Sequence, residues 1–309
     1  MAKANGVKKK RSYGINQLLN FSKNSYLERT SRPIYAAVFL LPFIVFYEVG
    51  TILINTDVLR QSQIRVVAFV WLQNFLEYLG FASKFAWMAP PLAVLIILLS
   101  LQTVSRKSWK LLPADLWKMA VESILLAVPL LLFNMALINS PRQPAAPDAV
   151  GSNTACQFQL DGKITSCSAG RINSPYNQPE DTGAAQPQSG ALANIVTGIG
   201  AGIYEELIFR LILISVLMIV LYDICGFSHG NAIILAVAFS AALFSAHHHI
   251  DFWSGRHTEA FELTRFLFRT IAGVYFAALF SVRGFGITAG THAFYDIIAV
   301  FINAYIGRG

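Results

Sequence analysis

The second half of the chain places two adjacent glutamates and an arginine inside one apolar run. The run extends from Gly198 to Tyr222, and Glu205, Glu206 and Arg210 lie in its first half. A charge at membrane depth costs at least ~2.5–3.5 kcal/mol on insertion scales, so each of these residues is a functional candidate. On an α-helix Glu206 and Arg210 lie four residues apart and can pair, whereas Glu205 lies about 100° around the helix from Glu206. We therefore expect Glu205 to find its partner on another helix.

Two later apolar segments also carry polar residues with the spacing of one helical turn. Phe244 and His248 are four residues apart, as are His292 and Asp296, so each pair shares a helix face. A carboxylate can act as a general base, and an imidazole can position water or donate to an oxyanion. Three such segments together predict a shared polar cavity that is suited to hydrolysis.

The remaining histidines and one further buried acid are assigned lesser roles by the sequence. On a continuous helix, His247 and His249 point away from the face of His248. Glu48, in the first apolar segment, is expected to line the cavity or to hydrogen-bond across helices. His229 and His257, in polar surroundings, are expected to be solvated.

The composition is that of an integral membrane protein with several spans. Of the 309 residues, 55% are hydrophobic and only 13% are charged, whereas soluble domains carry about 25% charged residues. The net charge of +7 comes mostly from residues near the ends of apolar runs, where orientation signals and anionic lipids explain it. Nucleic-acid binding is therefore not expected, and the fold predicted is an all-α transmembrane bundle.

The hydropathy pattern predicts seven or eight spans and no cleaved signal peptide. Seven segments have the length and composition of spans: 34–54, 85–104, 116–138, 192–222, 230–249, 266–283 and 286–305. The aromatic segment 64–82 is read as an interfacial or re-entrant helix or as an eighth span. The N-terminal tail and the loop after residue 104 are rich in basic residues, and the positive-inside rule favours the cytoplasm for both segments. Both can be cytoplasmic if segment 64–82 does not cross the membrane.

The same topology puts a long loop, rich in Pro, Gly, Ser, Asn and Gln, outside the cytoplasm. Cys156 and Cys167 are its only cysteines, and an oxidising compartment favours a disulfide between them. The predicted organisation is a basic cytoplasmic tail (1–33), N-terminal transmembrane helices (34–138), the extracytoplasmic loop (139–190) and a catalytic transmembrane domain (191–309). At the start of that domain, the small residues Gly198 and Gly202 allow close approach of a neighbouring helix to Glu205.

The ordered set of motifs resembles that of the CAAX protease and bacteriocin-processing family. The motifs are Glu205-Glu206-x-x-x-Arg210, Phe244-x-x-x-His248 and His292-x-x-x-Asp296, and the resemblance covers roughly residues 190–305. Members of this family are intramembrane glutamic endopeptidases, and the type II CAAX prenyl endopeptidases are among them. No part of the first half of the chain matches a motif.

The resemblance implies a role for each matching residue and no cofactor or metal. Glu205 corresponds to the catalytic general base, His248 to the histidine that positions the water, and His292 to the residue that stabilises the oxyanion. Asp296 stands where the family often has Asn, and a carboxylate donates only when protonated, so it either acts in catalysis or orients His292. Glu206, Arg210 and Phe244 are implied to support the site.

The resemblance also implies a substrate class and a location. We expect cleavage near the C-terminus of a membrane-associated protein, lipidated or bearing a sorting signal, in a bacterial inner membrane. Three alternatives stay open: a zinc protease that uses Glu205, His248 and His292, an ion-coupled transporter, and a non-enzymatic immunity or chaperone protein. The sequence also leaves one geometric conflict, because the predicted spans put His248 and His292 near opposite ends of their helices.

Overall fold

The computed structural model describes residues 21–57, 66–81, 87–138, 190–250 and 261–306, and this part of the chain contains helices and no strand. Cys156, Cys167 and His257 lie outside the described residues. Within these described ranges, six helices are long and apolar enough to cross a membrane. These results confirm the predicted all-α membrane bundle.

The spanning segments agree closely with those predicted from hydropathy. They are Pro33–Ile54, Pro113–Leu137, Ala191–Ile224, His229–Ala246, Leu263–Arg283 and Phe285–Ala304. The predicted span 85–104 corresponds to α4 (Ala89–Ser105), an apolar helix whose 17 residues are at the lower limit for crossing the hydrocarbon core. The ambiguous segment 64–82 contains α3 (Val67–Tyr78), whose 12 residues extend only about 18 Å, too short for an eighth span.

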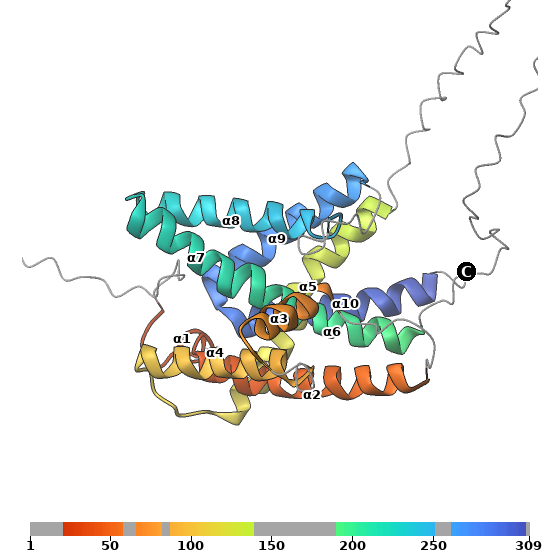
Figure 1. Cartoon of the computed structure of the whole chain (residues 1–309), viewed down its shortest axis with the longest axis horizontal. Helices are drawn as coiled ribbons and strands as arrows, with labels where there is room; N and C mark the ends of the chain where they lie inside the picture. The colour runs from red at the N-terminus through yellow and green to blue at the C-terminus, as the bar shows by residue number, and fades with distance from the viewer. Residues whose placement is uncertain (1–20, 58–65, 82–86, 139–189, 251–260, 307–309) are drawn as a thin grey trace, which may run out of the picture. The chain divides into compact units, whose positions relative to one another are not determined.

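The segment that carries the glutamates is the centre of the bundle. It consists of α6 (Ala191–Glu206), the π-helix η2 (Leu207–Leu213), α7 (Ile214–Met218) and a second π-helix, η3 (Ile219–Ile224). Figure 1 shows α6 between α2 (Pro33–Asp57) and α10 (Phe285–Ile306). On the other side, α8 (His229–Ala246) and α9 (Leu263–Arg283) form an antiparallel pair that packs against η2 and α7.

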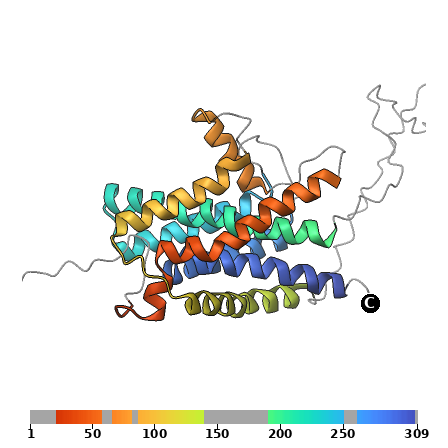
Figure 2. The ribbon, with the colours of Figure 1, turned by 90° about the horizontal axis from the view of Figure 1, so that it is seen from below.

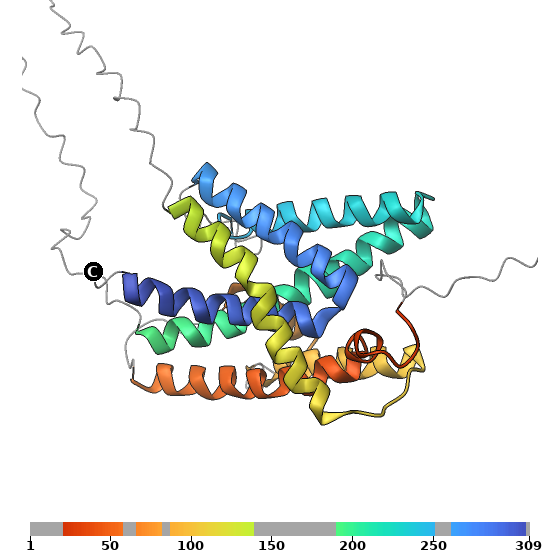
Figure 3. The ribbon, with the colours of Figure 1, turned by 180° about the vertical axis from the view of Figure 1, so that it is seen from behind.

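The remaining helices cover this central group. In Figure 2, α3 runs obliquely to the long helices, and it packs against α4 and α6. In Figure 3, α5 (Pro113–Ile138) crosses in front of α10, and the hydroxyl of Tyr275 on α9 donates to the carbonyl of Leu126 on α5 at 2.7 Å. The short helix α1 (Tyr26–Thr30) lies within the predicted tail.

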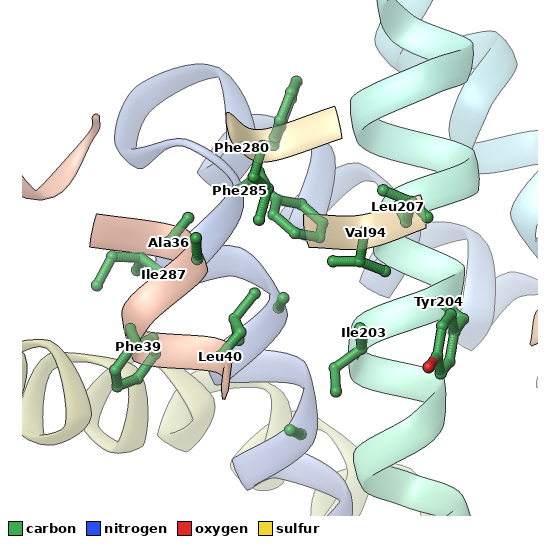
Figure 4. Packing of buried hydrophobic residues seen from close by; sticks show 14 of the residues in the cluster. Ala36, Phe39, Leu40, Val94, Ile203, Tyr204, Leu207, Phe280, Phe285 and Ile287 are labelled. Carbon is green, nitrogen blue, oxygen red and sulfur yellow. The ribbon is translucent and has the colours of Figure 1, made fainter. Parts of the chain in front are cut away.

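Buried apolar side chains from four neighbouring helices hold α6 in place. Figure 4 shows Ile203, Tyr204 and Leu207 facing side chains from the neighbouring helices. The neighbours labelled there are Ala36, Phe39, Leu40, Val94, Phe280, Phe285 and Ile287. Glu205 and Glu206 lie between Tyr204 and Leu207 in the sequence. Because the residues on either side are packed against neighbouring helices, both glutamates are also buried in the bundle.

Ion pairs and hydrogen bonds tie α1 to α5 and α9. Arg283, the last residue of α9, contacts Glu122 of α5 through Nε at 2.6 Å and Nη2 at 2.8 Å, and it also donates to the Thr30 hydroxyl. The Tyr26 hydroxyl donates to Glu122 at 2.7 Å, and Arg29 pairs with Asp115 at 2.8 Å. The last part of the predicted tail is therefore anchored by charge-assisted hydrogen bonds.

A single glycine connects α9 to α10. Gly284 has φ +81° and ψ 179°, a conformation that is essentially restricted to glycine. The connection lets α10 begin at Phe285 and fold back beside α9. This sharp reversal places His292, the eighth residue of α10, next to the C-terminal end of α6.

The two glycines of the predicted helix-approach motif do contact a neighbouring helix. A Cβ atom on Gly198 would lie 2.6 Å from the Cβ of Asp296, and a Cβ on Gly202 would lie 2.6 Å from the backbone nitrogen of Ala293. Both contacts are with α10, the helix that carries His292. The prediction that these small residues bring a helix close to the glutamates is confirmed.

We expect Gly202→Ala to lower the free energy of unfolding by about 1–3 kcal/mol and to reduce activity, because the added methyl group meets the α10 backbone and must push the helices apart. Thermal unfolding in detergent measures the first effect. Gly230→Ala on α8 is the matched control, since its Cβ has no neighbouring atom within 4 Å. Equal loss of stability in both variants would contradict the close-approach argument.

Candidate active site

The two adjacent glutamates occupy the last turn of α6 and are both buried. Glu205 is 6% exposed and Glu206 is fully buried. The helix changes from α to π geometry immediately after them, at Leu207. Short π segments inside α-helices are frequently found at functional sites. The two carboxylates point to different partners, as their rotation about the helix axis predicts.

Glu206 pairs with Arg210 on its own helix, as predicted from their spacing. The distance from Arg210 Nε to Glu206 Oε2 is 3.0 Å, in an ion pair without the angles of a good hydrogen bond. The guanidinium of Arg210 is fully buried and lies 4.1 Å from the ring centroid of Phe244. Its Nη2 donates to the carbonyl of Gly273 at 3.4 Å. Phe244 thus covers the arginine, a cation–π contact that supports the buried charge.

His292 connects the same carboxylate to Asp296. Its Nδ1 lies 2.8 Å from Glu206 Oε1, and its Nε2 lies 3.5 Å from Asp296 Oδ2. The imidazole ring also stacks on Phe276, with 4.5 Å between the ring centroids. Both ring nitrogens therefore face carboxylates, and the ring plane is fixed by an aromatic neighbour.

The partner of Glu205 comes from the residues that follow α8. His247 Nε2 lies 3.5 Å from Glu205 Oε1, and His247 is 3% exposed. The prediction that Glu205 pairs with a different helical segment is confirmed, but the prediction that His247 points elsewhere is wrong. The helix ends at Ala246, so His247 and His248 lie in a turn where helical periodicity no longer applies.

Both histidines of this turn contact one backbone oxygen. His248 Nδ1 lies 2.9 Å from the carbonyl oxygen of Phe244, and His247 Nδ1 contacts the same oxygen. With Nδ1 as the donor, a neutral ring carries its lone pair on Nε2, so His247 forms an ion pair with Glu205 only when both of its ring nitrogens carry a proton. The available ligand atoms of Glu205, His247 and His248 all lie within 4.8 Å of one another. A carboxylate and two imidazoles therefore converge on one small volume.

The turn also resolves the conflict in the predicted topology. The predicted span 230–249 is three residues too long at its C-terminal end, because α8 ends at Ala246. His248 and His292 can then lie at one level, and the Phe244 ring lies 5.2 Å from His248 and 6.1 Å from His292 between centroids.

Three other residues that the sequence singled out, Glu48, His249 and His229, make separate contacts. Tyr204 donates to Glu48 Oε1 at 3.2 Å, so Glu48 makes the predicted hydrogen bond across helices, next to Glu205 in sequence. His249 is buried against Phe261 and Phe266, and His229 is partly exposed and lies 5.6 Å from the Tyr222 ring.

One contact near the site was not predicted from the sequence. Trp71 of α3 lies 5.7 Å from the His247 ring and 6.4 Å from the Phe209 ring, measured between centroids. The aromatic character of segment 64–82 was the only signal of this role. Although α3 is too short to span a bilayer, it supplies an aromatic wall against the histidine that faces Glu205.

The site therefore has two connected parts with different chemistry. In the first, Glu205 faces His247 and His248, where a carboxylate can accept a proton from water and a histidine can hold that water. In the second, Glu206 is neutralised by Arg210 and holds His292. The set Glu205, His248 and His292 required by the zinc alternative is not gathered, because both nitrogens of His292 face other carboxylates.

Comparison with known proteins identifies the region that contains this site. Residues 187–298 match a family model described as Rce1-like, type II CAAX prenyl endopeptidase. The matched region begins just before α6, ends within α10 and includes every residue of both parts of the site. No curated protein and no solved structure matches the chain. The resemblance predicted from the ordered motifs is confirmed.

Proposed function

We propose, from the premise that residues 187–298 form a domain of the Rce1-like type II CAAX prenyl endopeptidase family, that this multi-pass membrane protein is a glutamic endopeptidase. The observation that carries the proposal is the convergence of buried Glu205 with His247 and His248 inside that domain. We further assign catalysis to residues 191–309 and place the protein in a bacterial inner membrane.

In the proposed reaction, Glu205 activates a water molecule. The water lies between the carboxylate and the Nε2 atoms of the two histidines, which accept its second hydrogen bond or orient it. Glu205 takes one proton while the water oxygen attacks the carbonyl carbon of the scissile peptide bond. The C–N bond then breaks, and the proton held by Glu205 passes to the departing amine, so the carboxylate is regenerated.

His292 is proposed to stabilise the negative charge that develops on the substrate carbonyl oxygen. Its Nε2 is the nitrogen that remains when Nδ1 donates to Glu206. Nε2 then donates to the substrate oxygen only from an imidazolium, with both ring nitrogens protonated, and the carboxylates of Glu206 and Asp296 that face the ring favour this charged form. A donor held in this way is preorganised, and such donors contribute strongly in sites that exclude water. Asp296, at 3.5 Å from Nε2, orients the ring in this proposal. Arg210 pairs with Glu206 and holds it in place.

The proposed substrate is a membrane-associated protein or peptide that is cut near its C-terminus, carrying a lipid or a sorting signal. An active site among apolar helices favours a substrate that is already held in the bilayer. No metal has a step in this mechanism. Activity that is retained after chelator treatment is therefore expected, and chelator-sensitive activity with stoichiometric zinc would favour a metalloprotease instead.

The proposed function is tested by identifying cleaved peptides. The purified chain in liposomes is incubated with candidate lipidated and sorting-signal peptides, and the products are identified by mass spectrometry. We expect C-terminal fragments with the wild type and none with Glu205→Gln. Fragments that are identical with both proteins would contradict proteolysis by this site, and proton-coupled uptake that persists in Glu205→Gln would favour a transporter.

A further inference from the structure

A cavity of about 430 Å³ lies between the start of α2, the end of α4, the segment η2–α7–η3 and the start of α10. Most of its lining is apolar, and two cationic side chains, Arg32 and Lys107, also line it. We propose that this cavity binds one anionic phospholipid, with an acyl chain between the helices and the phosphate group at the two cations. Among the described residues that line it, none belongs to either part of the candidate active site, so the binding does not rest on the proposed function.

The apolar part of the cavity suits an acyl chain. Leu98, Phe280 and Phe285 line it and are at most 6% exposed, so they form a buried apolar wall. Leu101 and Val104 of α4 also line it, and their side chains are exposed, so this side of the cavity faces the bilayer. A lipid chain can therefore enter sideways from the hydrocarbon core. The volume lies within the range of about 300–1,000 Å³ that is usual for ligand pockets.

The charges at the cavity favour an anion. Arg32 pairs with Glu28 through Nη2 at 2.6 Å, and its Nη1 donates to the carbonyl of Ser108 at 3.4 Å, so the guanidinium is held in place. The hydrogen bond from Arg32 lowers the pKa of Glu28, and the charge of Lys107 acts in the same direction. Two cations and one carboxylate therefore leave one net positive charge at this end of the cavity, which a phosphate group would neutralise.

The cationic end of the cavity lies where phospholipid headgroups are expected. Arg32 immediately precedes α2, and Lys107 follows the end of α4 by two residues, in a loop that also contains Arg106 and Lys110. Both cations thus lie at the ends of apolar helices, and the positive-inside rule assigns this end to the cytoplasmic face. Basic pockets between membrane helices on that face bind the headgroups of anionic lipids. An anionic phospholipid therefore matches both parts of the cavity.

A bound phospholipid would contact the two segments that carry the active site. Leu211 of η2 and Ser215 of α7 line one side of the cavity, and Phe285, the first residue of α10, lines another. Glu206 immediately precedes η2, and His292 lies on α10. A ligand that binds only the folded chain stabilises it by mass action. We therefore expect anionic phospholipid to raise the temperature of unfolding.

Headgroup selectivity is measured first. The full chain, delipidated in detergent, is titrated with phosphatidylglycerol or phosphatidylcholine of the same acyl chains, and bound lipid is counted by native mass spectrometry. We expect one phosphatidylglycerol to bind in preference to phosphatidylcholine. Lys107→Gln is expected to weaken phosphatidylglycerol binding about fivefold, which corresponds to ~1 kcal/mol for one cation near the membrane surface. Lys110→Gln is the matched control, because Lys110 is exposed in the same loop and does not line the cavity, and its effect should stay below about twofold.

The position of the acyl chain is tested with two substitutions of Ser215. Ser215→Phe places a large side chain at the cavity, whereas Ser215→Ala removes the same hydroxyl, which donates to the Leu211 carbonyl, and adds no bulk. We expect phosphatidylglycerol to raise the midpoint of thermal unfolding of the wild type and of Ser215→Ala, but not of Ser215→Phe. Each variant is compared with its own midpoint without lipid, so a general loss of stability does not affect the result.

Four outcomes overturn the inference. Equal binding of the two phospholipids by the wild type removes the headgroup assignment. Equal weakening in Lys107→Gln and Lys110→Gln shows that the charge of the loop, and not the cavity, attracts the lipid. Lipid stabilisation that persists in Ser215→Phe places the acyl chain elsewhere, and displacement of phosphatidylglycerol by a lipidated peptide assigns the cavity to the substrate. All four are measured without cleavage, so the proposed protease activity is tested separately.

Discussion

Replacing Glu205 with Gln is expected to lower the rate of peptide cleavage by about 10²–10⁴-fold, the contribution typical of a positioned general base. The amide keeps the shape of the side chain but cannot take a proton from water at neutral pH. The carboxylate lies 3.5 Å from His247 and is 6% exposed, so it is shielded from bulk solvent that could supply a substitute base. Single-turnover cleavage of an identified substrate in liposomes measures this effect directly.

The matched control for this prediction is Glu262→Gln. Glu262 precedes α9, its side chain is 55% exposed, and it pairs with the exposed Arg265. We expect its rate to be within about twofold of the wild type, because exposed pairs contribute little. Cleavage by Glu205→Gln at the rate of the control would mean that Glu205 is not the base.

Arg210→Met is expected to lower the free energy of unfolding by about 3–5 kcal/mol, because it leaves the buried carboxylate of Glu206 without its cation. Both side chains are fully buried, and the guanidinium is also in contact with the Phe244 ring. The midpoint of unfolding in a denaturing detergent titration measures the loss. Arg265→Met, whose side chain is 62% exposed, is the control and should change stability by less than ~1 kcal/mol.

A second substitution separates a lost charge pair from lost packing. If the cost of Arg210→Met comes from an uncompensated charge, adding Glu206→Gln removes that charge and restores part of the stability. If the cost comes from lost packing, the double variant is at least as unstable as the single one. In both cases the double variant is expected to be inactive, because a glutamine at position 206 lacks the carboxylate that contacts His292.

The spans and the first charge pair could be predicted because both follow from local periodicity. Spanning segments need about 20 apolar residues, and a hydropathy pattern reports this length directly. The pairing of Glu206 with Arg210 and the close contact at Gly202 follow from i,i+4 geometry on one helix. These are properties of single helices, and the structure confirms each of them.

The position of His247 could not be predicted in the same way. The periodicity argument assumed that α8 continues through His249, and no proline or glycine in the segment marks an earlier end. Once the helix ends at Ala246, the turn brings two neighbouring histidines to the same side, against Glu205. The second partner of Glu206 could not be predicted for a related reason, since His292 reaches it only through the reversal at Gly284.

The two parts of the site are attached to the bundle by different means. Glu206 lies on α6 and His292 lies on α10, and the backbones of these two helices are in contact at Gly202. This close contact fixes the distance between the two side chains. His247 instead follows the free end of α8, and spanning helices tilt to match the thickness of the surrounding hydrocarbon. A change in bilayer thickness is therefore expected to change the distance between the Glu205 carboxylate and the His247 imidazole. The buried pair of Glu206 and Arg210 is expected to stay unchanged. A lipid composition that changes this thickness should thus affect the rate of turnover through Glu205 alone.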